Sequence, residues 1–221
     1  MSKQLMVCLI LVAVLGDQFM QIEGGPGFFT KAMTGMMGVN NKREAGRSDL
    51  HDAAEKGLLE AVENYIKKGA KVDSTDKLKR NPLHYAAMKG HKNVVEFLIT
   101  KGANVNFEDH IKQTPLHFAA ENGHKDVVEM LIMKGATVDP IDENKRTPLH
   151  LAAANDHIDV VEFLIRQGAN LENEDRDGQT PISSAFGKGH MYTVEKLQQN
   201  NAKVDKIPEI GQTVLWWFHN P

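Results

Sequence analysis

Apolar residues recur along this chain in blocks that are almost identical in spelling. Three such blocks are VVEFLI at 94–99, VVEMLI at 127–132 and VVEFLI at 160–165. A shorter stretch precedes each block, as NPLHYAA at 81–87, TPLHFAA at 114–120 and TPLHLAA at 147–153. We expect a short first helix in each shorter stretch and a second helix in each apolar block. A pattern with one fixed period predicts a repeat architecture.

The repeating unit is 33 residues long, and the residues that recur in it have physical roles. The units begin with residues whose side chains can cap a helix N-terminus, at Ser48, Asn81, Thr114, Thr147 and Thr180. From the second unit on, proline follows at the first helical position, where its missing N–H costs nothing. Glycine stands where a left-handed helix cap is expected, at Gly69, Gly102, Gly135 and Gly168.

Aspartate and histidine recur at the same period. Because Asp76, Asp109, Asp142 and Asp175 form a row along the stack, we expect them to shape turns rather than to form an acid/base pair. Eight of the ten histidines occupy two repeated positions, at His51, His84, His117 and His150 and at His91, His124, His157 and His190. We expect them to bridge local backbone groups. No HExxH or paired Cys/His spacing indicates a metal site.

These units resemble the ankyrin repeat. The T-P-L-H-x-A signature of that family stands here as Thr114-Pro115-Leu116-His117-Phe118-Ala119 and again from Thr147 to Ala152. The resemblance covers about Ser48 to Asp205. It implies an all-α fold, a solenoid of stacked helix-turn-helix units with projecting hairpin loops. Stacking is required because one helix pair cannot bury its own apolar face.

The predicted organisation follows from the repeat. It comprises a signal peptide at 1–16, a flexible Gly- and Met-rich leader at 17–47, ankyrin repeats at 48–80, 81–113, 114–146 and 147–179, a degenerate fifth repeat at 180–210, and a partial repeat or C-terminal cap at 211–221. In the last segment, VLWWF at 214–218 is interpreted as an apolar lid over the final helix pair. The alternative is an exposed aromatic patch.

The N-terminus has the pattern of a secretory signal. Lys3 is the only charged residue before Asp17, and LMVCLILVAVL runs between them at 5–15. This run is shorter than the about 20 apolar residues of a membrane span, so we favour cleavage after Gly16, with a retained hydrophobic N-terminus left open. The only cysteine, Cys8, lies inside the run, so a cleaved chain has no thiol. In the leader, GFFTKAMTGMMGV is an alternative partner or membrane segment, and Lys42-Arg43 an alternative trimming site.

Composition argues against other functional classes. Net charge is -3, with 41% hydrophobic and 25% charged residues, so we expect no nucleic-acid partner. There is no G-x-S-x-G elbow and no phosphate-binding G-x-x-x-x-G-K-[ST]. We therefore predict no enzyme, no catalytic residue, no metal and no cofactor.

The resemblance implies where a partner binds. In the ankyrin family the concave surface of loop tips and first helices usually binds other proteins, and its variable positions are the candidate contacts. At the loop tips these are Lys77, Leu78, Arg80, His110, Ile111, Gln113, Glu143, Asn144 and Arg146, and on the first helices Met88, Lys89, Glu121 and Asn122. Leu78 and Ile111 either pack against each other, which we favour slightly, or anchor a partner.

Lysine replaces a family glycine at three loop tips. Lys79, Lys112 and Lys145 stand where the family commonly has glycine, and only Gly178 keeps it. A lysine there either strains or re-aims the turn, or contributes to a basic ridge for an acidic partner.

These observations favour a secreted, non-enzymatic, monomeric protein whose concave face captures another protein, with no membrane span after signal cleavage. One alternative is a secreted effector or venom-like component that acts on a host or prey target. Another is an intracellular ankyrin scaffold or inhibitor, which applies if the N-terminal segment is not a signal.

Overall fold

A computed structural model describes residues 47–205 and 207 of the chain. This part contains five helix pairs: α3 (Asp49–Glu55) with α4 (Leu59–Lys67), α5 (Pro82–Met88) with α6 (Lys92–Thr100), α7 (Pro115–Glu121) with α8 (Lys125–Met133), α9 (Pro148–Ala154) with α10 (Ile158–Arg166), and α11 (Pro181–Gly187) with α12 (Met191–Gln199). The predicted signal peptide, nearly all of the leader and the segment 214–218 lie outside the described residues.

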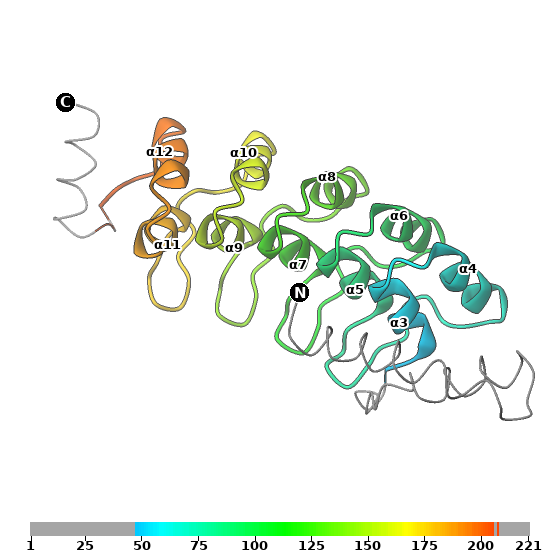
Figure 1. The fold of residues 1–221 in the computed structure, drawn as a ribbon. Coiled ribbons are helices and arrows are strands. Elements are labelled where there is room, and N and C mark those ends of the chain that lie inside the picture. The colour runs from blue at the N-terminus through cyan, green and yellow to red at the C-terminus, as the bar shows by residue number, and fades with distance from the viewer. Residues whose placement is uncertain (1–46, 206, 208–221) are drawn as a thin grey trace, which may run out of the picture. The chain divides into compact units, whose positions relative to one another are not determined.

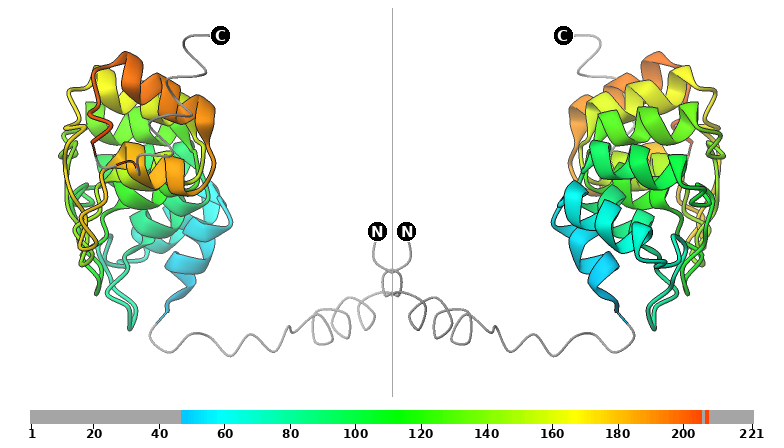
Figure 2. Two further views of the ribbon diagram at one scale, coloured as in Figure 1. Left: turned by 90° about the vertical axis from the view of Figure 1, so that its left-hand side faces the viewer. Right: turned by 90° about the vertical axis from the view of Figure 1, so that its right-hand side faces the viewer.

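The helix pairs stack side by side in two rows (Figure 1). Each first helix packs against the first helix of the next pair, and each second helix packs against the next second helix. The views along the stack show the two rows as two layers, with the loops between pairs extending away from them (Figure 2). The predicted all-α solenoid of stacked helix-turn-helix units is confirmed.

The short first helices begin as the sequence predicts. Each has an extended residue at its N-cap, and each of α5, α7, α9 and α11 carries proline in its first turn. Glycines at the ends of the helices adopt positive φ, as at Gly69 (90°) and Gly102 (89°). Asn201 replaces this glycine in the fifth repeat and adopts the same conformation with φ 67°. The local signals therefore place every helix pair in the predicted register.

The apolar core is continuous from one repeat to the next. The second helices α6, α8 and α10 each bury two valines and a leucine without any exposed area, namely Val94, Val95 and Leu98, then Val127, Val128 and Leu131, then Val160, Val161 and Leu164. Ala61 and Tyr65, the equivalents of Val94 and Leu98 in the first repeat, are only half-buried. A residue at these positions is thus fully buried only where a preceding helix pair covers it, which is why the unit must be repeated.

Two irregular residues of the last repeats compensate for each other. Thr193 replaces the buried valine of other repeats and is itself fully buried. Its hydroxyl donates a 2.7 Å hydrogen bond to Oδ1 of Asp156. Asp156 in turn occupies, with φ 59°, the position that Gly57, Gly90 and Gly123 hold in the first three repeats. A buried hydroxyl is therefore satisfied by a residue that departs from the repeat one unit earlier.

Arg47 belongs structurally with the first repeat, although its sequence placed it at the end of the leader. Its Nε lies 2.6 Å from Oδ1 of Asp52, and its guanidinium also pairs with Glu55. The guanidinium carbon lies 4.3 Å from the centre of the Tyr85 ring, on the next repeat. The arginine thus joins the first two repeats through two ion pairs and a cation–π contact.

Replacing Leu131 with alanine tests the burial of the central repeat. This side chain is completely buried in α8, so Leu131→Ala is expected to reduce the free energy of unfolding by roughly 2–5 kcal/mol, measured by urea denaturation. Met133 lies on the same helix but is 80% exposed, so Met133→Ala is the control and should leave the urea midpoint nearly unchanged. Equal effects of the two substitutions would contradict the described packing.

Candidate functional site

The four loops between helix pairs, at 71–80, 104–113, 137–146 and 170–179, are built around the recurring aspartates. In the first loop, Oδ1 of Asp76 accepts hydrogen bonds from the backbone N–H groups of Leu78 (2.8 Å) and Arg80 (2.9 Å). Asp109, Asp142 and Asp175 accept the same pair of hydrogen bonds in their own loops. The aspartate rows therefore shape the turns, as the sequence predicts.

Each turn closes on a residue in the left-handed conformation. The backbone N–H of Lys79 donates to the carbonyl of Asp76 at 3.1 Å, and Lys79 itself has φ 55°. Lys112 (62°), Lys145 (58°) and Gly178 (72°) repeat this geometry. A hairpin loop of this type usually has glycine at this position, because a Cβ is disfavoured there. The predicted strain at the three lysines is therefore present.

Neighbouring loops are joined through their backbones. The N–H of His110 donates to the carbonyl of Leu78 (2.9 Å), that of Glu143 to Ile111 (2.8 Å), and that of Arg176 to Asn144 (2.9 Å). Further up the loops, side chains at one repeated position accept an N–H from the next loop, as when Asn106 Oδ1 accepts from Thr137 (2.9 Å). The loop tips thus form one hydrogen-bonded row with fixed spacing.

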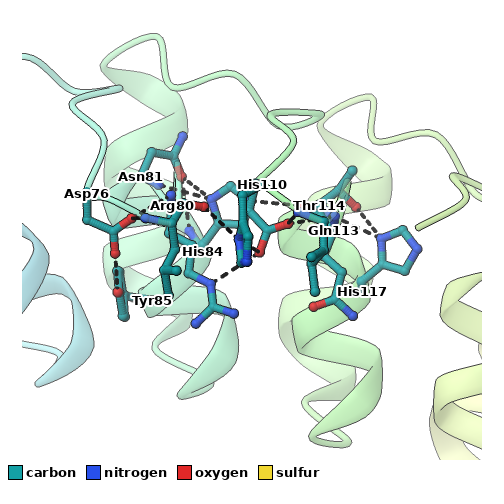
Figure 3. A network of polar contacts seen from close by, with 12 residues as sticks. Asp76, Arg80, Asn81, His84, Tyr85, His110, Gln113, Thr114 and His117 are labelled. Carbon is teal, nitrogen blue, oxygen red and sulfur yellow. Dashed lines mark hydrogen bonds and ion pairs between the residues drawn. The ribbon is translucent and has the colours of Figure 1, made fainter. Parts of the chain in front are cut away.

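The loops also pack on the first helices. The hydroxyl of Tyr85, on α5, donates to Oδ2 of Asp76 at 2.6 Å (Figure 3). Burial alone would raise the pKa of Asp76, but this bond and the two backbone N–H groups lower it overall, so the carboxylate stays charged. In the next repeat, Arg80 Nε donates to Asp109 Oδ2 (3.2 Å), and its guanidinium stacks over Phe118 of α7 (4.8 Å).

Four buried histidines connect each helix pair to the base of the loop that leads to the next pair. Nδ1 of His117 accepts a hydrogen bond from the backbone N–H of Thr114 at 3.1 Å, so it carries no proton, and Nε2 must donate. Nε2 donates to the carbonyl of Arg146, 3.1 Å away in the next loop. His51, His84 and His150 make the same two contacts, with the distant one to the carbonyl of Arg80, Gln113 and Gln179 respectively. Figure 3 shows His84 beside Asn81 and Gln113.

Ser183 takes this position in the fifth repeat. Its Oγ accepts from the N–H of Thr180 (2.8 Å) and donates back to the carbonyl of the same residue (2.9 Å). The serine therefore keeps the local half of the histidine contact, and its single O–H proton is used there.

A second row of histidines ties each repeat to the one before it. Nε2 of His91 lies 2.8 Å from the carbonyl of Glu55, and those of His124, His157 and His190 lie 2.9–3.2 Å from the carbonyls of Met88, Glu121 and Ala154. A Cβ on Gly90 would come within 2.6 Å of the His124 ring, which explains that glycine. The prediction of local backbone bridging is correct for Nδ1 of the first row, whose partner lies three residues away. The other partners are distant in sequence, 29 residues ahead for the first row and 36 residues back, in the preceding repeat, for the second row.

Burial keeps the first histidine row neutral. It lowers the pKa of His84 from 6.5 to about 4, and it also lowers the pKa of His51, His117 and His150, although hydrogen bonds to carbonyls oppose the shift. Among the described residues, no group of three His, Cys, Asp or Glu side chains is arranged to hold a metal ion.

The comparison with known families now assigns the architecture. The family model described as ankyrin repeats (3 copies) matches residues 50–142 and 134–207. The chain belongs to the ankyrin-repeat family. Membership indicates a protein–protein interaction module in a family that is generally not enzymatic. A search of curated proteins found no match. No helix in residues 47–205 is long and apolar enough to cross a membrane.

Most candidate residues of the ankyrin loops and helices are accessible. Exposed side chains are Lys77, His110, Glu143, Asn144, Lys89 and Asn122, and half-buried ones are Leu78, Arg80, Ile111, Arg146, Met88 and Glu121. Gln113 requires a correction, because it is only 4% exposed. The N–H of Gln113 donates to Asp109 and its carbonyl is bound by His84, so the residue lies at the base of the loop and not at its tip.

The candidate residues of the helices lie on the side that faces the loops. Met88, the last residue of α5, and Lys89, its C-cap, follow Tyr85 by three and four positions, so they lie on the same side of the helix as Tyr85. Tyr85 contacts the loop residue Asp76, which places this face beside the loops. Glu121 and Asn122 have the same relation to Phe118, over which Arg80 stacks. We call the loop tips and this side of the first helices the inner face.

Acid is expected to weaken the ankyrin stack through the buried histidines. A pKa that is lower in the folded state means that the unfolded chain binds more protons, so stability is complete above pH 6.5 and falls as the pH decreases toward about 4. His84 alone accounts for roughly 3 kcal/mol of this loss. Urea midpoints at pH 7 and pH 5 measure it. The difference between them should be smaller in His84→Asn, and an unchanged difference would contradict this assignment.

The strained loop tips yield a reciprocal prediction. Lys112→Gly removes a Cβ from the left-handed region and is expected to stabilise the ankyrin stack by up to about 1 kcal/mol, after the entropy cost of glycine is subtracted. Gly178→Lys introduces the same strain and should destabilise it by a similar amount. Thermal unfolding of both variants gives the answer. Changes of the same sign in the two variants would show that strain is not the cause.

Proposed function

We propose that this ankyrin-repeat protein is a secreted, non-enzymatic binding protein and that its inner face holds a protein partner. The carrying observation is the contrast between backbone and side chains at the loop tips. At each tip, backbone N–H groups and carbonyls form hydrogen bonds with the aspartate of that loop and with the neighbouring loop. The conformation of the tip is therefore fixed before a partner binds. A preorganised surface loses little entropy on binding.

The side chains at these tips remain accessible and differ from repeat to repeat. The two residues before the left-handed turn position are Lys77 and Leu78 in the first loop, His110 and Ile111 in the second, and Glu143 and Asn144 in the third. Identical backbones therefore present different chemistry at regular intervals. Such a surface can recognise one particular partner sequence, while the core that carries it stays constant.

Secretion is proposed from the N-terminal sequence. The apolar run at 5–15 follows Lys3 and precedes Gly16, which is the order of a signal peptide. Expression in a secretion-competent eukaryotic cell, followed by N-terminal sequencing, tests this. The expected product is in the medium and starts near Asp17, or near Glu44 if Lys42-Arg43 is also cut. A product that stays in the cell with Met1 or Ser2 at its start would exclude secretion and direct the partner search to the cytosol.

Photo-crosslinking tests the binding face. Benzoylphenylalanine is placed at Lys89 or Asn122 to probe the inner face. As controls it is placed at Thr100 or Met133, which are exposed on the second helices α6 and α8. The two positions of each pair are equivalent in neighbouring repeats. In extracellular fluid of the source organism, a discrete protein adduct is expected only from the first two positions. Excess unlabelled protein should abolish it. Adducts of equal yield from all four positions would reject the inner face as the binding surface.

A further inference from the structure

Three lysines occupy the most costly position of the loops. Lys79, Lys112 and Lys145 are exposed, and each is held at φ between 55° and 62° by the hydrogen bonds of its turn. Gly178 shows that the fourth loop forms the same turn without a side chain. Each lysine therefore adds backbone strain that glycine would avoid, and such strain is retained preferentially at functional sites.

The fold supplies no structural reason for these lysines. None of the three has an ion-pair partner among the residues that the structure describes. The carboxylates beneath them are already occupied, since Asp109 bonds two backbone N–H groups and Arg80, and Asp142 bonds two backbone N–H groups and Arg146. Lysines placed in a row also repel one another, so the arrangement is unfavourable until an anion lies across it.

A second lysine row in the same protein provides the contrast. Lys68, Lys101 and Lys134 recur with the same period and are equally exposed, but each follows the last residue of a second helix. A positive charge at a helix C-terminus is stabilised by the helix dipole, so this row has a structural explanation. Each lysine at the loop tips stands instead two residues before a helix N-cap, where the helix dipole does not favour a positive charge.

Building on the proposed function, we propose that the partner segment held at the loop tips is an extended acidic peptide that lies across Lys79, Lys112 and Lys145. We call these three residues the lysine row. Leu78 and Ile111 directly precede Lys79 and Lys112 in the first two loops. Their half-buried side chains give the peptide an apolar strip beside the charges. In the fourth loop, Gly178 lacks the lysine and Asp177 is exposed, so the acidic segment ends at the third loop.

The geometry also sets the spacing of the acidic residues. Packed helices lie about 8–10 Å apart, so the hydrogen-bonded loops that precede neighbouring first helices follow one another at about that distance. A peptide in the extended polyproline II conformation advances about 3.1 Å per residue with three residues per turn, so every third side chain lies on the same face and meets a lysine. Aspartate or glutamate at positions i, i+3 and i+6 therefore fits the lysine row, and the same residues in one block do not.

Two synthetic peptides of identical composition test this spacing. One carries aspartate at every third position among serine, glycine and leucine, and the other carries the aspartates in one block. Fluorescence anisotropy with the full chain should show at least about threefold tighter binding of the spaced peptide, which weakens as salt rises from 50 to 500 mM. Equal binding of both peptides, or equal binding of a short DNA oligonucleotide, would reduce the lysine row to a general anion surface and overturn the proposal.

Matched variants separate the lysine row from net charge. Lys79→Gln, Lys112→Gln and Lys145→Gln together keep the strained backbone and should remove the preference for the spaced peptide. Lys68→Gln, Lys101→Gln and Lys134→Gln together change the net charge equally and should leave the preference intact. If both triple variants behave alike, the lysine row is not the binding site. Photo-adducts from Lys89 that persist undiminished in the first variant would overturn this inference while leaving the proposed function standing.

Discussion

The structure depends on an imidazole that forms two hydrogen bonds at once. In His117, Nδ1 accepts a hydrogen bond from the backbone N–H of Thr114, the N-cap of its own helix. Nε2 donates to the carbonyl of Arg146 at the base of the following loop. This contact sets the position of a helix pair against the start of the next pair, because a neutral imidazole has one donor and one acceptor on opposite sides of the ring and the bound carbonyl directly precedes the next N-cap. Stacking, continuous burial and the alignment of the loops follow from that fixed relation.

The same contact explains how an irregular loop keeps a defined shape. Each loop is held at its base by a histidine of the helix pair before it, in its middle by an aspartate, and at its side by the backbone of its neighbour. Because the backbone is satisfied in this way, the exposed tip side chains, such as Lys77 and Glu143, are not needed to shape the loop and are free to serve recognition. A left-handed lysine is tolerated there because the surrounding hydrogen bonds determine the conformation regardless of the residue.

Much of this could be predicted from the sequence, and the limits are physical. Helix pairs, caps and aspartate turns are local, so their signals repeat every 33 residues and can be compared within one chain. Partners that are distant in sequence are set by the stacking of helix pairs, which is why the sequence alone does not predict the carbonyl bound by His117 or the bond between Thr193 and Asp156. The sequence does not predict the position of Arg47, because its partners Asp52 and Tyr85 lie in the first two repeats and nothing in the leader indicates them. The sequence places Gln113 at a loop tip and so predicts exposure. The residue is buried instead, because its carbonyl is bound by His84 at the base of the loop.

The ring tautomers of His117 and His150 test this account most directly. A long-range ¹H–¹⁵N NMR spectrum of the labelled protein at neutral pH distinguishes a protonated from an unprotonated ring nitrogen. The account predicts that both rings carry their proton on Nε2, with a slowly exchanging N–H held by the carbonyls of Arg146 and Gln179. A proton on Nδ1, or rapid averaging between the two tautomers, would mean that these histidines do not join each helix pair to the loop that follows it.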